Sequence, residues 1–194
     1  NATIGLKNIA IGQLAMAGVT TGQADDNIAI GRSALAGAAG TTGNDNIAIG
    51  SNAMDALTTG NNNIALGLNA LGAATDNMDN IAIGRTALAA SGNDADFNIA
   101  IGYHTMGVGD VSGSNNIVLG TDAGLSMTSA SFNVAIGVNA MCTLSNQSHS
   151  IAIGYHAGLS GNIGCNINIG CCMDNTTASA TCIGGACVMA AQFT

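Results

Sequence analysis

A pentapeptide, Asn-Ile-Ala-Ile-Gly or a close variant, recurs twelve times along this chain of 194 residues. From the second copy to the eleventh, successive copies lie 16 to 19 residues apart, and the differences in length fall between the motifs. A period of this size is typical of solenoids, in which each coil buries its apolar side chains against the next coil. The chain is therefore expected to form one stack of coils. The closing glycines are Gly5, Gly12, Gly31, Gly50, Gly67, Gly84, Gly102, Gly120, Gly137, Gly154, Gly170 and Gly184.

Within the motif, large and small apolar residues alternate with a period of two, as in Ile28-Ala29-Ile30. Such alternation predicts a short β-strand with two different faces. We expect the isoleucines to fill the core, and the alanines to form a face that another sheet can approach closely. The glycine that follows permits a tight bend. A second apolar pair, such as Ala34-Leu35, and then a polar loop complete one coil.

These features predict an all-β fold, a parallel β-solenoid of about 11 to 12 coils with repeats of 16 to 19 residues. At roughly 4.8 Å per coil, such a rod is on the order of 55 Å long. Asparagine opens ten of the twelve motifs, so the stacked amides are expected to form a hydrogen-bonded ladder. Regular repeats are expected over residues 1–163. Residues 164–194, where Asn168 and Cys182 replace the central alanine, are expected to form a degenerate, cysteine-rich cap.

Composition excludes several classes of protein. The chain has 3 Lys and Arg residues against 11 Asp, with a net charge of -8, so binding to nucleic acid through phosphate neutralisation is not expected. Polar residues interrupt every apolar run before the roughly 18 residues that a membrane-spanning helix needs, so no membrane insertion is expected. Disorder is not expected either, because 47% of the residues are hydrophobic.

The repeat Asn-Ile-Ala-Ile-Gly-x-x-Ala-Leu/Met resembles the head repeats of trimeric autotransporter adhesins. It is also similar to repeats of bacteriophage and large-virus tail-fibre proteins, in which the loop tends to carry Thr-Thr-Gly-Asn-Asn, as residues 58–62 do here. The resemblance covers about residues 1–170. It implies a left-handed parallel β-roll, three identical chains around a common axis, and a role in adhesion or as a rigid fibre segment. The repeat length and the cysteine-rich end depart from the autotransporter pattern.

Six cysteines concentrate toward the C-terminus. Residues about one coil apart stack in a solenoid, so disulfides between adjacent coils, such as Cys165 with Cys182 or Cys172 with Cys187, or disulfides between subunits, would clamp the end of the rod. Six cysteines allow 15 connectivities, and none is assigned. Buried free thiols and a zinc site are the alternatives, although no C-x-x-C spacing supports zinc. The candidate disulfide cysteines are Cys142, Cys165, Cys171, Cys172, Cys182 and Cys187.

Two Tyr-His pairs, Tyr103-His104 and Tyr155-His156, follow the motif glycine in matching positions three coils apart. This repetition predicts one surface row, and these side chains are the candidate contacts to a receptor or glycan. We expect no catalytic residues, no metal site and no cofactor, because no nucleophile has an acid or base partner. Aspartates in the loops could bridge calcium, but turn formation accounts for them more simply.

The leading hypothesis is a non-enzymatic fibre segment, extracellular or on a virion surface. It would form a rigid homotrimer that presents loops to a host-cell glycan or receptor. Two alternatives remain open. An ice-binding solenoid would need a flat, regular row such as Thr-x-Thr on one face. A stacking subunit of an extracellular filament would need ends that join.

Overall fold

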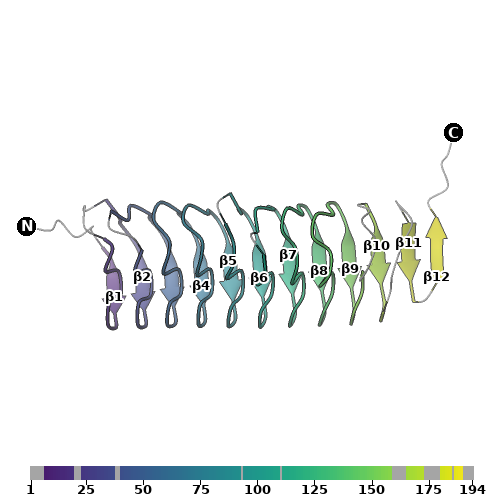
Figure 1. Cartoon of the computed structure of the whole chain (residues 1–194), viewed down its shortest axis with the longest axis horizontal. Coiled ribbons are helices and arrows are strands. Elements are labelled where there is room, and N and C mark those ends of the chain that lie inside the picture. Colours follow the sequence, from purple (N-terminus) through teal and green to yellow (C-terminus); the bar gives the residue numbers. More distant parts are fainter. Residues whose placement is uncertain are drawn as a thin grey trace, which may run out of the picture.

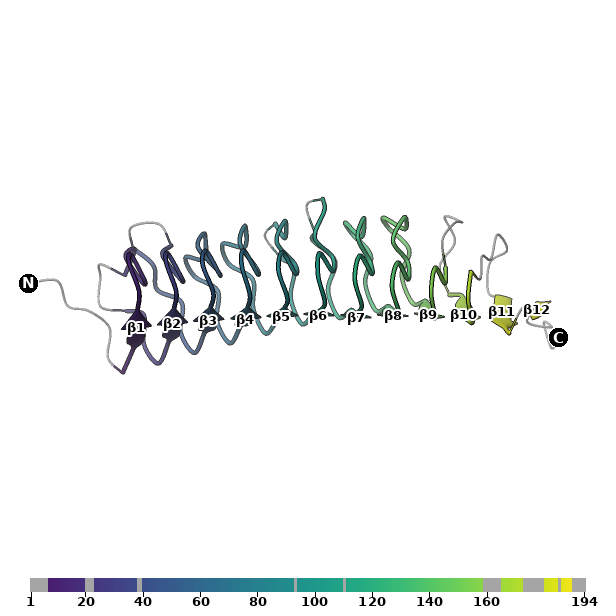
Figure 2. The ribbon, with the colours of Figure 1, turned by 90° about the horizontal axis from the view of Figure 1, so that it is seen from below.

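The computed structural model describes residues 7–19, 23–37, 40–92, 94–109, 111–158, 165–172, 180–184 and 186–189. For residues 180–182 and 186–189, only the backbone is described. The first motif, which ends at Gly5, lies outside these ranges. Within them the secondary structure is entirely β, and the strands form a single sheet in chain order (Figures 1 and 2).

The strands are short and follow the sequence motif. They are β1 (Ile9–Ile11), β2 (Ile28–Ile30), β3 (Ile47–Ile49), β4 (Ile64–Leu66), β5 (Ile81–Ile83), β6 (Ile99–Ile101), β7 (Ile117–Leu119), β8 (Val134–Ile136), β9 (Ile151–Ile153), β10 (Ile167–Ile169), β11 (Ala180–Ile183) and β12 (Ala186–Met189). Each strand from β1 to β11 pairs in parallel with the next. The predicted parallel β-solenoid is therefore confirmed.

The register aligns motif with motif. Between β2 and β3, for example, Ile28 pairs with Ile47 and Ala29 with Ala48. Differences in repeat length are taken up in the loops at the end of the sheet where the strands begin (Figure 1). The solenoid changes at its C-terminal end, where β12 pairs with β11 in the antiparallel direction. The strand β10, which lies beyond residue 163, still keeps the parallel register of the rod.

The faces of the strands are the reverse of those expected from the sequence. The central alanines, such as Ala29 and Ala65, are fully buried, whereas Ile49 is 38% and Ile117 is 40% exposed. The expectation that the isoleucines fill the core is therefore wrong. Each coil is narrow, so its interior has room for a methyl group from the strand and one larger side chain from the opposite wall.

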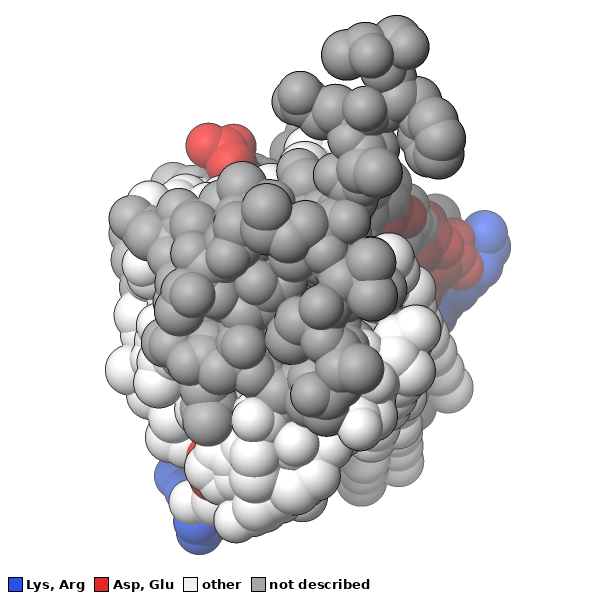
Figure 3. Space-filling model, turned by 90° about the vertical axis from the view of Figure 1, so that its right-hand side faces the viewer, with Lys and Arg blue, Asp and Glu red and all other residues white. Residues whose placement is uncertain are grey.

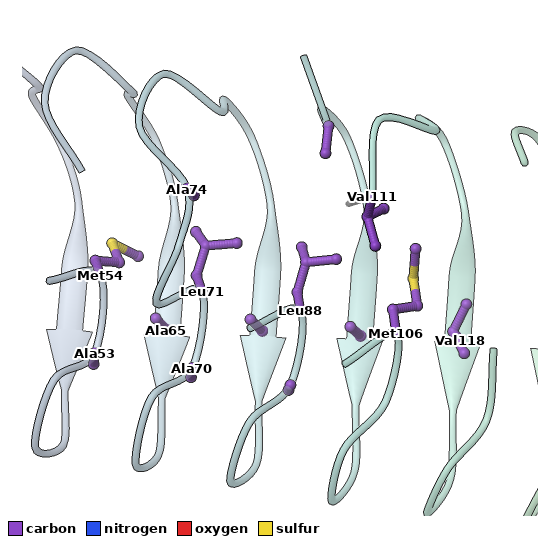
Figure 4. Packing of buried hydrophobic residues seen from close by; sticks show 14 of the residues in the cluster. Ala53, Met54, Ala65, Ala70, Leu71, Ala74, Leu88, Met106, Val111 and Val118 are labelled. Atoms are coloured by element: carbon purple, nitrogen blue, oxygen red, sulfur yellow. The ribbon is translucent and has the colours of Figure 1, made fainter. Parts of the chain in front are cut away.

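That larger side chain comes from the second apolar pair of each coil. Leu71, for instance, is fully buried opposite the strand together with Ala70 (Figure 4). Leu71 adopts a φ of 52°, and Met54 adopts 51°, in the left-handed region that disfavours bulky residues. Burial of the side chain offsets this cost, because a fully buried Leu or Met gains about 1.5 to 3 kcal/mol.

The coil of β7 has a glycine, Gly124, where its neighbours have Leu or Met. A Cβ atom at this position would lie 2.8 Å from Met127 Sδ and 3.0 Å from Val118 Cγ1. Val118 is the only non-alanine at the centre of strands β1 to β9. Larger residues at 118 and 127 therefore fill the volume that Gly124 leaves, and the core stays packed.

The motif glycine forms the bend after each strand. Gly31 has a φ of 135°, and a Cβ atom there would lie 2.5 Å from the carbonyl oxygen of Gly50 in the next coil. Only glycine satisfies both the backbone conformation and the close approach of the next coil. The predicted tight bend is confirmed.

Candidate functional site

The motif asparagines form the predicted ladder inside the solenoid. Asn63 is fully buried, and its Nδ2 donates to Asn46 Oδ1 at 3.0 Å and to the Asn77 carbonyl at 2.7 Å. Its Oδ1 accepts hydrogen bonds from the backbone N–H and the side chain of Asn80, at 3.0 and 3.2 Å. Ser150 continues the row, because its Oγ accepts the Asn166 N–H at 3.3 Å. This ladder holds the coils in register.

A second ladder runs two residues before the first one, and the sequence analysis did not identify it. The Asn44 N–H donates to Asn61 Oδ1 at 2.8 Å, and the Ser114 N–H donates to Ser131 Oγ at 3.0 Å. These positions carry mostly Asp, Asn and Ser, so the sequence did contain a signal for the second ladder. The same residues are common in turns, and they were interpreted only as turn residues. The two ladders make the loop edge at the start of the strands rigid.

The Tyr-His residues lie in one exposed row at the opposite edge of the sheet, where the strands end, just after the motif glycine. Tyr103 is 42% exposed and Tyr155 is 53% exposed. His104 Nδ1 lies 3.1 Å from Asp122 Oδ1, and His156 Nε2 lies 3.2 Å from Asn139 Nδ2. The predicted surface row is confirmed, while its role in binding a receptor stays a prediction.

Tyr103 also contacts one of the few cations of the chain. Arg85 Nη2 donates to the Tyr103 hydroxyl at 2.8 Å, and its guanidinium lies 4.6 Å from the centre of the ring. Because Tyr155 has no comparable arginine among its described contacts, the two Tyr-His pairs differ in local charge. In the end-on view of Figure 3, the visible charged side chains lie at the corners of the cross-section, and the visible flanks are uncharged.

The outer face of the sheet is aliphatic from β1 to β10. The first and third residues of β1 to β10 are Ile, Leu or Val without exception. We call this surface the aliphatic face. Several of its side chains are more than a third exposed, including Ile9, Ile11, Ile49, Ile117 and Ile136. Parallel sheets are normally covered on both faces, so an uncovered aliphatic face is unusual.

The cysteines do not stack as the sequence analysis expected. Ile167 pairs with Thr181, a shift of fourteen residues, so the backbone of Cys182 lies beside Asn168 and not beside Cys165. Cys187 lies on β12, where it is paired with Cys182. The pairings of Cys165 with Cys182 and of Cys172 with Cys187 are therefore wrong as stacked neighbours. The physical reasons are the short last repeat, which brings Cys182 beside Asn168, and the reversal of chain direction at β12, which pairs Cys187 with Cys182.

The remaining cysteines are free thiols in the structure. Cys171 and Cys172 are exposed, and their Sγ atoms lie 3.0 Å apart. The hydrogen bond with Cys171 raises the pKa of the Cys172 thiol. Burial raises the pKa of the Cys142 thiol, which makes it less reactive at neutral pH.

The loop aspartates occupy turn positions. Asp26, Asp45 and Asp79 have φ values of 57° or 58°, a conformation that Asp and Asn adopt more readily than other residues. The described residues contain no group of three or more His, Cys, Asp or Glu side chains placed to hold a metal ion. No helix in the described part of the chain is long and apolar enough to cross a membrane.

Comparison with known proteins finds no family model, no curated protein and no solved structure that matches the chain. The geometry of the molecule is therefore the basis for the proposals that follow.

Proposed function

We propose that the chain is a non-enzymatic segment of an attachment fibre that assembles as a homotrimer through the aliphatic face. The supporting observation is the continuity of this face. From β1 to β10 it extends over nine strand spacings, on the order of 45 Å in length, with two aliphatic side chains on each strand. Monomeric soluble proteins rarely leave so long an apolar strip exposed to water.

A second copy of the same chain would pack against this face and bury it. Its side chains repeat with the spacing of the strands, so an identical surface offers ridges and hollows of the same period. Charge does not oppose the contact, because the aliphatic face itself carries no ionisable group. Three chains around an axis, as in the fibres that the repeat resembles, would bury the face and leave both loop edges outside.

In this arrangement the function is rigidity combined with multivalency. The two ladders hold the loop edge at the start of the strands in a fixed position, and three chains would present three copies of each row. Weak contacts to a host surface would then add up through avidity. The expected location of such a fibre is extracellular or on a virion surface, and its partner is a host-cell glycan or receptor.

Sedimentation equilibrium tests the assembly. The wild-type chain of 18.9 kDa is expected to sediment as a trimer at micromolar concentration. The double variant Ile49→Lys/Ile117→Lys places two charges on the aliphatic face and is expected to dissociate. Leu68→Lys/Val138→Lys is the matched control, because Leu68 and Val138 are each 43% exposed but lie directly after the bend, off this face. A wild-type monomer, or a double variant of unchanged mass, would refute the proposal.

Fewer features of the structure favour the two alternative functions, ice binding and filament assembly. The central alanines are buried, so they are not a surface for ice, and the outer positions of β1 to β10 carry no threonine. A measurement of thermal hysteresis tests the ice-binding alternative directly. For a filament, the antiparallel β12 interrupts the parallel stacking at the C-terminal end. Electron microscopy distinguishes separate rods from continuous filaments.

A further inference from the structure

Two rows of side chains border the aliphatic face, one at each end of the strands. The second residue before each strand from β1 to β10 belongs to what we call the start row, which extends from Lys7 to Cys165. The second residue after each of these strands belongs to the end row, which extends from Gln13 to Cys171. Each coil thus contributes one residue to each row.

Both rows face solvent in the single chain. Every residue of the start row is exposed, and so are eight of the ten residues of the end row. The two residues from one coil are six positions apart, with an extended segment of roughly 16 to 20 Å between them. They are therefore too far apart to contact each other within one chain. The only contacts of either row with another copy would be at the edges of the aliphatic face.

Threefold symmetry would bring the two rows together at equal heights. The strands β1 to β10 all run in the same direction, from the loop edge to the bend (Figure 1). When three rods stand around one axis with their aliphatic faces inward, each strand ends where the strand of the next chain begins. Rotation about the axis leaves the height along the rod unchanged. The end row of each coil therefore meets the start row of the same coil in the partner subunit.

Residues at equal heights are complementary in charge. The end row contains both arginines of the chain, Arg32 and Arg85, and the start row of the same two coils contains Asp26 and Asp79. Within the described residues, neither arginine forms an ion pair with a carboxylate. A shift by one coil in either direction would place Arg85 opposite an uncharged residue. Charge therefore favours the arrangement without a shift.

The apolar residues of the two rows match in the same way. Phe97 shares its coil with Tyr103, and Phe132 shares its coil with Val138. These four side chains are between 42% and 56% exposed in the single chain. Contact between subunits would remove part of this apolar surface from water, which is favourable.

The coil of β10 has a cysteine in both rows, and no other coil has one in either row. Cys165 and Cys171 are exposed free thiols on the two sides of β10. In the arrangement without a shift, each Cys165 lies opposite Cys171 of the partner subunit. A shift by one coil would leave Cys165 opposite Tyr155 or beyond the last coil of the regular rod.

We propose that the three chains assemble in register, with the end row of each chain against the start row of the partner subunit, and that Cys165 forms a disulfide with Cys171 of the partner subunit. This inference rests on the proposed trimer and identifies its contacts. The two rows form the rim of each interface, and the loops beyond them remain outside. A lysine at the rim can keep its charge in water, so Leu68→Lys/Val138→Lys remains compatible with assembly.

A small-molecule disulfide, such as glutathione disulfide, is the oxidant for this bond. The Cys171 thiolate attacks one sulfur of the oxidant and releases one glutathione. The Cys165 thiolate of the partner subunit then attacks the Sγ atom of Cys171 and releases the second glutathione. The two protons lost by the cysteines end on the two glutathione thiols. Three such bonds close a ring that links all three chains covalently.

Gel electrophoresis in denaturant without reductant tests the disulfide after oxidation of the whole chain with glutathione disulfide. The wild type is expected to migrate as a covalent trimer, and fragment mass spectrometry is expected to locate the bond between Cys165 and Cys171. Cys165→Ser and Cys171→Ser are each expected to abolish the covalent trimer. Cys142→Ser is the matched control and is expected to retain it.

Charge reversal tests the register independently of the cysteines. In sedimentation equilibrium with reductant, Asp79→Arg and Arg85→Asp each place like charges opposite each other at three interfaces. Each variant is expected to weaken the trimer about tenfold. Asp79→Arg/Arg85→Asp restores opposite charges and is expected to recover most of the wild-type affinity. Asp45→Arg/Arg85→Asp changes the same charges on unmatched coils and is expected to recover none.

The outcomes separate the register from the trimer. A wild-type trimer that forms no bond between Cys165 and Cys171 would overturn the register, and so would a double variant at residues 79 and 85 that is no tighter than the single variants. Both results would leave the trimer itself intact. A wild-type monomer in sedimentation equilibrium would refute the trimer and this contact together.

Discussion

Replacement of Asn63 by alanine tests how much the buried ladder stabilises the rod. The substitution removes the only donor to the Asn77 carbonyl among the described contacts, at 2.7 Å, and the acceptor of the Asn80 N–H, at 3.0 Å. Asn46 Oδ1 still accepts the hydrogen bond from the Asn63 backbone N–H, at 3.0 Å, in the variant. Two buried backbone groups are therefore left without a partner. Each such group costs about 1 to 3 kcal/mol, so the expected loss is about 2 to 6 kcal/mol.

The loss is measured as the shift of the urea unfolding curve, followed by far-ultraviolet circular dichroism at one protein concentration. Asn63→Ser is expected to lose less, because Ser150 in the same row still accepts a backbone N–H. Thr59→Ala, an exposed change in the same coil, is the control. Hydrogen exchange should also show that the Asn80 amide loses protection in Asn63→Ala. If Asn63→Ala and Thr59→Ala unfold at the same urea concentration, the ladder does not stabilise the rod and the reasoning fails.

Three further predictions concern single side chains. Asn77 is fully buried, and neither its Nδ2 nor its Oδ1 has a hydrogen-bond partner. Because an unpaired buried polar group opposes folding, Asn77→Ala should raise the midpoint of urea unfolding. An unchanged or lower midpoint would contradict this prediction. Burial raises the pKa of Asp55, so its ionised form opposes folding above that pKa. Asp55→Asn should therefore be more stable than the wild type at pH 7, and the difference should disappear as the pH falls below about 4; a difference that persists at pH 3 would contradict it. The antiparallel pairing of Cys182 with Cys187, next to a two-residue connection, places their Cα atoms about 4.5 Å apart, which suits a disulfide. Fragment mass spectrometry after oxidation with glutathione disulfide should locate a disulfide between Cys182 and Cys187, and Cys182→Ser should abolish that bond; a wild-type chain in which the two thiols stay unlinked would contradict the prediction.

The sequence alone determined the repeat architecture. Glycine recurs where the backbone needs a φ that other residues avoid, and asparagine recurs where a buried amide must bond to the coils on both sides. Both requirements are local and identical in every coil, so they appear as a periodic pattern. The strands, the bend at residues such as Gly31 and the ladder through Asn63 could be predicted for that reason.

The tertiary structure decided which face of each strand lies inside. Alternation in Ile28-Ala29-Ile30 defines two faces but does not give the width of the coil, and the usual preference of isoleucine for the core pointed to the wrong one. The opposite wall supplies Leu35 or its equivalent, which leaves space for only a methyl group from the strand. The isoleucines consequently face outward.

The candidate site residues also divide into those that the sequence could predict and those that only the folded structure revealed. The Tyr103 and Tyr155 row could be predicted because both residues sit at the same offset from the motif glycine. Phe97 and Phe132 also share one offset, directly before the motif asparagine, but only the folded coil shows their left-handed φ and their exposure. The suggested cysteine neighbours were wrong because the last parallel repeat spans only fourteen residues, which pairs Cys182 with Asn168, and because the chain reverses direction between β11 and β12. Sequence periodicity therefore determined the coils and their register, whereas the volume inside a coil and the path of the chain at its end depended on the tertiary structure.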